Sequence, residues 1–247
     1  MKAMILAAGL GTRLRPLTND RPKALVEIDG RTLLEITLCR LQHFGVREVI
    51  VNVHHFADKI VEYLRSKNNF GMSIEISHEE DLLLDTGGGL KKAVGFFGDG
   101  PADEPFIVHN VDVLSNIDLA RMVDFHRERG SLATLAVQRR ESSRQLLFDS
   151  QLQLCGRHRK GESPEIVRPW EHPRALAFSG IHVVSPQIFK KMTEQGVFSI
   201  IEVYLRLASA GEKITAFPSD QYYWRDLGRP EQIEQAAQDV RSRKFVP

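Results

Sequence analysis

The chain has 247 residues, of which 42% are hydrophobic and 26% are charged, a composition that suits one large α/β domain. Its 33 basic and 32 acidic side chains give a net charge of +1, which offers no electrostatic basis for a nucleic acid as the main partner. Two cysteines are too few for a disulfide framework and lack metal-site spacing. Because no leader-like segment or membrane-spanning apolar run is present, we expect a cytoplasmic protein with no membrane partner.

Strand and helix patterns alternate over the first 140 residues. Short apolar runs predict strands, and apolar residues repeating at helical spacing predict helices. The expected strands cover 2–8, 48–53, 73–77, 106–109 and 132–137. The expected helices cover 33–44, 57–67, 88–97 and 119–129, with Gly45 as a stop and Asp118 as a cap. This order predicts a doubly wound, mostly parallel sheet flanked by helices.

The rhythm breaks over residues 139–175. Short strand-like pieces at 146–148 and 152–155, between charged and Pro-containing turns, predict a small antiparallel lid insert. The expected elements after it are a strand at 176–184, helices at 187–194 and 200–210, strands at 214–217 and 222–224, and a helix that opens at Pro230. No repeat or flexible linker is visible, so residues 1–247 are expected to form a single domain.

The most informative segment follows the first predicted strand. Gly9 and Gly11 allow backbone N–H groups to approach an anion, and Arg13 and Arg15 add positive charge. Lys23 follows at a short distance, next to a proline. A loop of this kind suits a nucleoside triphosphate.

Two common nucleotide-binding loops are excluded. The segment does not read G-x-x-x-x-G-K-[ST], the pattern of a P-loop. Leu14 stands where a dinucleotide-binding loop has its third glycine, and the next strand ends in His54-His55 rather than in an acidic residue. A nicotinamide-dependent enzyme is therefore disfavoured.

The loop resembles the signature of the sugar-1-phosphate nucleotidyltransferases, also called sugar-nucleotide pyrophosphorylases. The matching residues are Gly9, Gly11, Thr12, Arg13, Leu14, Pro16, Thr18, Pro22 and Lys23. Four later segments are also similar to family motifs: Thr86-Gly87-Gly88-Gly89, Asn110-Val111-Asp112, Phe178-Ser179-Gly180-Ile181 and 224–231. The resemblance covers roughly 1–115 and 175–235, whereas 139–175 matches poorly.

This resemblance implies a Rossmann-like, GT-A-like fold. It also implies transfer of a nucleotidyl group from a nucleoside triphosphate to a sugar 1-phosphate, with Mg²⁺ as cofactor and Mn²⁺ as a substitute. Such a reaction needs cations and positioning more than a nucleophilic side chain.

The resemblance assigns roles to individual residues. Lys23 and Arg13 are the expected catalytic residues, Lys23 at the α-phosphate and Arg13 at the β- and γ-phosphates. The expected metal ligands are Asp112 and Asp226, each placed just after a predicted strand. The expected nucleotide-binding residues are Leu6, Ala7, Ala8, Gly9, Gly11, Thr12, Arg13, Glu80, Gly87 and Asn110. The expected sugar-phosphate-binding residues are Gly88, Arg144 and Gly180.

Several positions leave alternatives open. Arg15 reaches either phosphate or only the solvent, Arg144 reaches either the sugar phosphate or solvent, and Gly180 marks either a ligand or a bulge. Val111 departs from the family pattern, which has glycine there. The family's E-K-P motif is not clear, with 167–169 as its nearest match.

The substrate expectation also comes from the resemblance. Ala7-Ala8-Gly9 and residues 85–89 are most similar to family members that use UTP and N-acetylmuramate 1-phosphate, which would make a cell-wall or surface-polysaccharide precursor. The alternatives are guanylyl transfer to mannose or heptose 1-phosphate, cytidylyl transfer to phosphocholine, and a non-catalytic protein that senses a nucleotide sugar. A monomer or a homodimer is expected.

Overall fold

The computed structural model describes residues 1–98 and 104–246. They divide into two compact units. Unit 1 comprises Met1–Leu83, Val108–Ile117 and Tyr222–Pro247, and unit 2 comprises Leu84–Ile107 and Asp118–Gln221.

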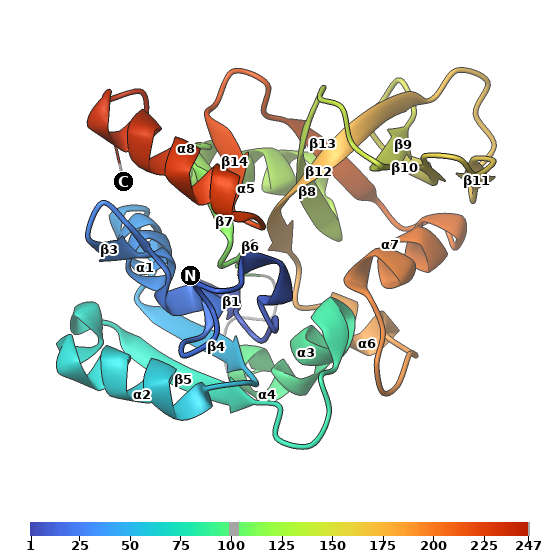
Figure 1. The fold of residues 1–247 in the computed structure, drawn as a ribbon. Coiled ribbons are helices and arrows are strands. Elements are labelled where there is room, and N and C mark those ends of the chain that lie inside the picture. The colour runs from blue at the N-terminus through green and yellow to red at the C-terminus, as the bar shows by residue number, and fades with distance from the viewer. Residues whose placement is uncertain (99–103, 247) are drawn as a thin grey trace. The chain divides into compact units, whose positions relative to one another are not determined.

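In unit 1, strands β1, β4 and β5, blue to cyan in Figure 1, pair in parallel. The strand order is β6-β1-β4-β5, with Met4 opposite Ile50 and Ile50 opposite Glu75. Buried side chains such as Leu38 of α1 and Ile60 of α2 form part of the core of this unit. Its elements are β1 (Lys2–Leu6), η1 (Thr12–Leu14), η2 (Lys23–Leu25), β2 (Glu27–Ile28), β3 (Arg31–Thr32), α1 (Leu33–His43), β4 (Glu48–Val53), α2 (Ala57–Ser66), η3 (Asn68–Gly71), β5 (Ser73–His78), the end of β6 (Phe106–Asn110), β7 (Val113–Ser115), β14 (Trp224–Asp226) and α8 (Pro230–Arg241).

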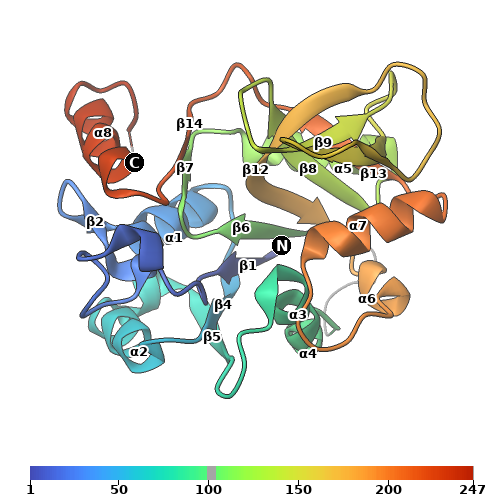
Figure 2. The same cartoon turned by 45° about the vertical axis from the view of Figure 1, so that its right-hand side comes forward.

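Unit 2 has a mixed sheet in which β8 pairs in parallel with β13 and antiparallel with β12, while β9, β10 and β11 add antiparallel strands. Helix α5 packs on β8, β12 and β13, and α7 packs on β10 and on α3 (Figure 2). The elements are α3 (Asp85–Lys92), α4 (Val94–Gly98), the start of β6, α5 (Leu119–Arg129), β8 (Ala133–Gln138), β9 (Arg144–Phe148), β10 (Leu154–Arg159), β11 (Glu165–Ile166), β12 (Arg174–Val184), α6 (Ile188–Lys191), α7 (Ile200–Ser209) and β13 (Ile214–Pro218).

The predicted fold class is confirmed: strands alternate with helices, and short antiparallel strands fill the region 139–175. The Asp118 side chain caps α5 by accepting a hydrogen bond from the Arg121 N–H, and Pro230 opens α8. None of the helices in the described part of the chain has the length and apolarity needed to cross a lipid bilayer.

Several predicted boundaries are wrong. The helix expected over 88–97 is two helices, α3 and α4, that break at Ala93. The strand expected from residue 152 starts at Leu154, because Leu152 has a φ of +64° in a turn whose N–H groups are held by the Asp149 carboxylate. The helix expected over 187–194 ends at Lys191, since Met192 is already extended.

A buried histidine in unit 2 makes stability depend on pH. His126 is 4% exposed, and its Nδ1 lies 2.9 Å from the Thr134 hydroxyl. Burial, helped by the neighbouring Arg127 charge, lowers the pKa of His126 from 6.5 to about 4. Between these two values the unfolded chain binds a proton that the folded chain does not, so the free energy of unfolding falls as the pH drops.

We expect His126→Gln to flatten this pH dependence. His126 accounts for a loss of about 3 kcal/mol in the free energy of unfolding between pH 6.5 and pH 4. Urea unfolding at pH 7, 6 and 5 measures the slope, with the exposed His172→Gln as the matched control. Burial also lowers the pKa of His109 to about 4, so part of the pH dependence of the free energy of unfolding remains in the variant. Equal slopes in the wild type and in His126→Gln would contradict this assignment.

Candidate active site

The glycine loop leaves the end of β1 and folds back on itself. The Ala7 N–H donates to the Asn52 carbonyl at 3.0 Å, which keeps the loop attached to β4. Gly11 then adopts a φ of +64°, a conformation that favours glycine, and its carbonyl accepts a hydrogen bond from the Thr18 hydroxyl at 2.8 Å. Gly11 and Thr18 therefore fix the shape of this loop together.

Lys23 lies at the start of η2, directly after Pro22, and is only 8% exposed. Its Nζ donates to Asp112 Oδ2 at 2.5 Å. Asp112 occupies the turn between β6 and β7, at the carboxyl end of β6. The structure thus joins the predicted catalytic lysine to a predicted metal ligand across 89 residues of sequence.

Backbone pairing between two strands places Asp226 next to Asp112. Strand β14 pairs antiparallel with β7, which places Asp226 opposite Val113, and the Leu227 N–H donates to the Asp112 carbonyl at 2.9 Å. The strand boundary expected at 222–224 is wrong: β14 covers Trp224–Asp226, so Asp226 is its last residue and does not follow the strand. Within the described residues, Asp226 Oδ1 is buried and has no hydrogen-bond partner.

The Arg13 side chain lies near the Asp226 carboxylate, over Gly228. A Cβ built on Gly228 would lie 2.9 Å from Asp226 Oδ1 and 3.0 Å from Arg13 Nη2. The guanidinium and the carboxylate therefore both lie over the glycine backbone. The sequence motif contained Gly228, but nothing in it indicated this contact.

We expect Gly228→Ala to lower activity without unfolding the protein. The added methyl group must displace the ends of two flexible side chains, so the backbone keeps its path while Arg13 and Asp226 move. Shifts of about 1 Å in positioning groups cost up to roughly 100-fold in rate, and we expect a loss of about 10-fold or more. Steady-state kinetics with thermal unfolding measures both effects. Gly95→Ala is the control, because a Cβ there meets nothing within 4 Å; equal activity in the two variants would argue against the contact.

The residues present fit a magnesium ion that takes some of its ligands from the protein and the others from water and a bound substrate. The described residues contain no group of three or more histidine, cysteine, aspartate or glutamate side chains that could hold a metal. Two carboxylates, one with an unpartnered buried oxygen, match the usual Mg²⁺ site, which takes one or two carboxylates and completes its shell with water and phosphate oxygens.

Two further predicted nucleotide-binding residues, Asn110 and Glu80, also belong to unit 1. Asn110 is the last residue of β6, and its Oδ1 is buried with no hydrogen-bond partner among the described residues. Glu80 is exposed, 3.7 Å from His78. The preceding Glu79, from the same acidic run, is buried and accepts a hydrogen bond from the Asn52 side chain.

The predicted sugar-side residues belong to unit 2, together with Gly87. The N–H groups of Gly87 and Gly88 donate to the Phe198 carbonyl at 2.9 and 3.2 Å, so both glycines also serve helix packing. Gly180 has a φ of +74° where the pairing of β12 with β8 shifts register, the geometry of a bulge. Arg144 opens β9 and is exposed.

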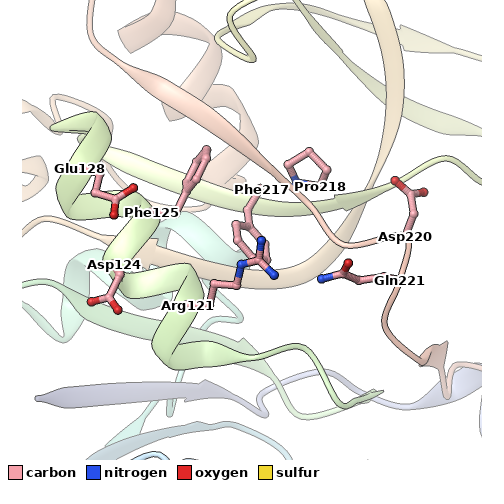
Figure 3. A pocket seen from close by; sticks show the side chains of 8 residues that line it. All are labelled: Arg121, Asp124, Phe125, Glu128, Phe217, Pro218, Asp220 and Gln221. Carbon is pink, nitrogen blue, oxygen red and sulfur yellow. The ribbon is translucent and has the colours of Figure 1, made fainter.

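Two hollows differ sharply in charge. In unit 1, a hollow of about 300 Å³ beside the glycine loop is lined by Leu10, Thr12, Arg15, Thr18, Asn19 and His55, with no carboxylate. In unit 2, a hollow of about 600 Å³ between α5 and the segment after β13 has one arginine and three carboxylates around Phe125 and Phe217 (Figure 3). The first suits an anion, whereas the second, which contains none of the predicted site residues, does not.

Comparison with known proteins agrees with the predicted fold and family. A solved UDP-glucose pyrophosphorylase in complex with UDP-glucose superimposes with a TM-score of 0.79 at 18% identity, covering 98% of both chains, which confirms the expected fold. The chain is 36% identical over 240 residues to an N-acetylmuramate alpha-1-phosphate uridylyltransferase of Caulobacter vibrioides, covering 93% of this chain and 92% of that one. It is 30% identical to a UTP–glucose-1-phosphate uridylyltransferase of Haloferax volcanii, with 96% of each chain covered.

The fold and these relatives define an enzyme of the nucleotidyltransferase class. The model of the nucleotidyl transferase family matches residues 2–243, and the chain belongs to that family. The resemblance drawn from the glycine loop is therefore confirmed.

Proposed function

We propose that this enzyme transfers a uridylyl group from UTP to a sugar 1-phosphate of the N-acetylmuramate type, releasing pyrophosphate. The observation that carries the proposal is the grouping of Lys23, Asp112, Asp226 and Arg13 beside the glycine loop of unit 1. The Caulobacter relative supports the choice of substrates, since it carries that name and matches almost the full length of the chain.

In the proposed reaction, a phosphate oxygen of the sugar 1-phosphate attacks the α-phosphorus of UTP. The new P–O bond forms as the bond to the β-phosphate oxygen breaks, and pyrophosphate leaves in line. The attacking phosphate is already an anion, so no general base is needed. What the protein must supply is positive charge where the phosphates crowd together.

Lys23 meets this need at the α-phosphate. Its ammonium has three N–H donors, and one of them is bound to Asp112 Oδ2. That bond aims the side chain and leaves two donors for phosphate oxygens. Because Lys23 is nearly buried, its charge is screened less than that of a surface lysine.

Arg13 and the loop backbone hold the rest of the triphosphate. The guanidinium over Gly228 provides a planar, charged donor set for the β- and γ-phosphates. Arg15 lines the neighbouring carboxylate-free hollow and adds positive charge there. Asp112 and Asp226 would hold Mg²⁺, with Mn²⁺ as a substitute, and the bound ion would neutralise charge on the phosphates.

A panel of triphosphates and acceptors tests the proposal. Purified enzyme is incubated with UTP, CTP, GTP or dTTP and with N-acetylmuramate, glucose, mannose or heptose 1-phosphate or phosphocholine, and pyrophosphate release is measured. We expect the highest kcat/KM for UTP with N-acetylmuramate 1-phosphate. Preference for glucose 1-phosphate, as in the name of the Haloferax relative, would correct the sugar, and binding without turnover would instead indicate a sensor.

The finer expectations stay predictions. They are a magnesium-dependent, cytoplasmic enzyme that acts as a monomer or homodimer and makes a precursor of the cell wall or of a surface polysaccharide. The roles of Glu80, Gly87, Gly88, Arg144 and Gly180 at the base and the sugar phosphate belong with them.

A further inference from the structure

A buried carboxylate on α8 accepts hydrogen bonds from a residue just before β14 and from a residue within it. The Asp239 side chain is 4% exposed. Its Oδ2 accepts from the Tyr223 hydroxyl at 2.7 Å, from Arg225 Nε at 3.1 Å and from Arg225 Nη2 at 2.6 Å. Burial raises the pKa of Tyr223 to about 12, so the phenol keeps the proton that it donates.

Two residues near the C-terminus, Lys244 and Phe245, also contact Asp239 and Tyr223. Lys244 Nζ lies 3.7 Å from Asp239 Oδ1, and the Phe245 N–H donates to the Asp239 carbonyl at 3.2 Å. The Phe245 ring stacks on Tyr223 with ring centroids 4.9 Å apart. Asp239 is thus held from both sides, and it provides a rigid anchor.

Strand β14 needs such an anchor. It has three residues and, in the part of the chain that the structure describes, pairs only with β7, in a two-stranded sheet of three residue pairs. Two-stranded ribbons of this size are marginally stable on their own. Figures 1 and 2 show β14 between β7 and α8, the helix that carries Asp239.

The anchor acts on the residue beside Asp226. Arg225 and Asp226 are neighbours on an extended strand, where successive side chains point to opposite sides. Fixing the Arg225 guanidinium on Asp239 therefore fixes the rotation of the strand. That rotation decides where the Asp226 carboxylate points, relative to Asp112 and to the Arg13 side chain over Gly228.

We propose that Asp239 is a positioning residue which, through Arg225 and Tyr223, holds Asp226 in the orientation needed to bind a divalent cation with the nucleotide. The inference rests on the proposed function, in which Asp226 is a metal ligand. It adds a residue on α8 that touches neither the metal nor the substrate.

The test compares two carboxylates with matched partners. Asp239→Asn weakens the anchor. Glu35→Gln changes a similar group on α1, where the carboxylate accepts from the hydroxyl of Tyr63 on α2 at 2.7 Å and from Nε of Arg31 on β3 at 3.2 Å. Binding of Mn²⁺ in the presence of UTP, followed by electron paramagnetic resonance, reports on the site without catalysis.

We expect Asp239→Asn to weaken Mn²⁺ binding about 10-fold, the usual effect of losing a group that orients a metal ligand, and Glu35→Gln to leave it unchanged. In turnover assays, Asp239→Asn should raise the Mg²⁺ concentration for half-maximal rate by a similar factor while the KM for the sugar phosphate stays the same. Should Asp239→Asn fail to fold, Arg225→Gln and Tyr223→Phe report on the same anchor.

Equal Mn²⁺ binding by Asp239→Asn, Glu35→Gln and the wild type would overturn the inference, as would equal loss in both variants. Failure of the proposed function looks different. In that case the wild type itself would neither bind Mn²⁺ with UTP nor release pyrophosphate with any acceptor.

Discussion

Lys23→Ala is expected to reduce kcat by roughly 10² to 10³-fold, the range found when one group that stabilises transition-state charge is removed. Lys23 is the buried cation bound to Asp112, and under the proposed mechanism it meets negative charge that grows as the sugar phosphate attacks. The interaction strengthens in the transition state, so the loss should fall on kcat more than on the KM for UTP. Pyrophosphate release under saturating UTP and sugar phosphate measures it.

Two controls separate charge from structure in this experiment. Lys23→Arg keeps a positive charge in a different shape and should recover part of the rate. Lys59→Ala removes an exposed lysine of α2 and should leave kcat unchanged. Circular dichroism establishes that each variant is folded. A Lys23→Ala enzyme with near-normal kcat would remove the lysine from the mechanism.

Asp226→Asn should both slow the enzyme and raise its requirement for Mg²⁺. The substitution keeps the shape of the side chain but removes the negative charge from the carboxylate whose Oδ1 is buried without a partner in the described structure. Loss of charge at a metal ligand should lower kcat at saturating UTP roughly 100-fold, because the ion would be held by Asp112 alone. The rate is measured as a function of Mg²⁺ concentration at fixed substrates.

The matched control for Asp226→Asn is Asp58→Asn, the same chemical change at an exposed position on α2. We expect its Mg²⁺ curve to superimpose on that of the wild type. Should Asp226→Asn lose rate with an unchanged Mg²⁺ curve, the carboxylate would have a role other than metal binding.

The sequence alone predicts the parts of the fold that depend on local pattern. The strand predicted over 48–53 is β4 to the residue, and Asp118 and Pro230 mark the starts of α5 and α8. These elements were predictable because burial of one strand, or capping of one helix, is decided by neighbours in the chain.

The contacts that organise the candidate site were harder to predict, since they join distant segments. Strand β14 depends on pairing with β7, more than a hundred residues away, so its limits were misplaced and Asp226 was put outside it. Gly228 read as a motif residue, but its role beneath Arg13 and Asp226 shows only in three dimensions. Asp239 carried no signal, because a carboxylate on a polar helix usually faces solvent.

The proposed mechanism requires Lys23, Asp112 and Asp226 to act on one triphosphate. A crystal structure of the enzyme with Mg²⁺ and a UTP analogue that cannot be cleaved between the α- and β-phosphates tests it directly. We predict that Mg²⁺ is bound by both carboxylates and a phosphate oxygen, with Lys23 Nζ within hydrogen-bond distance of the α-phosphate. A triphosphate bound away from Lys23, or a metal that touches neither aspartate, would contradict the account.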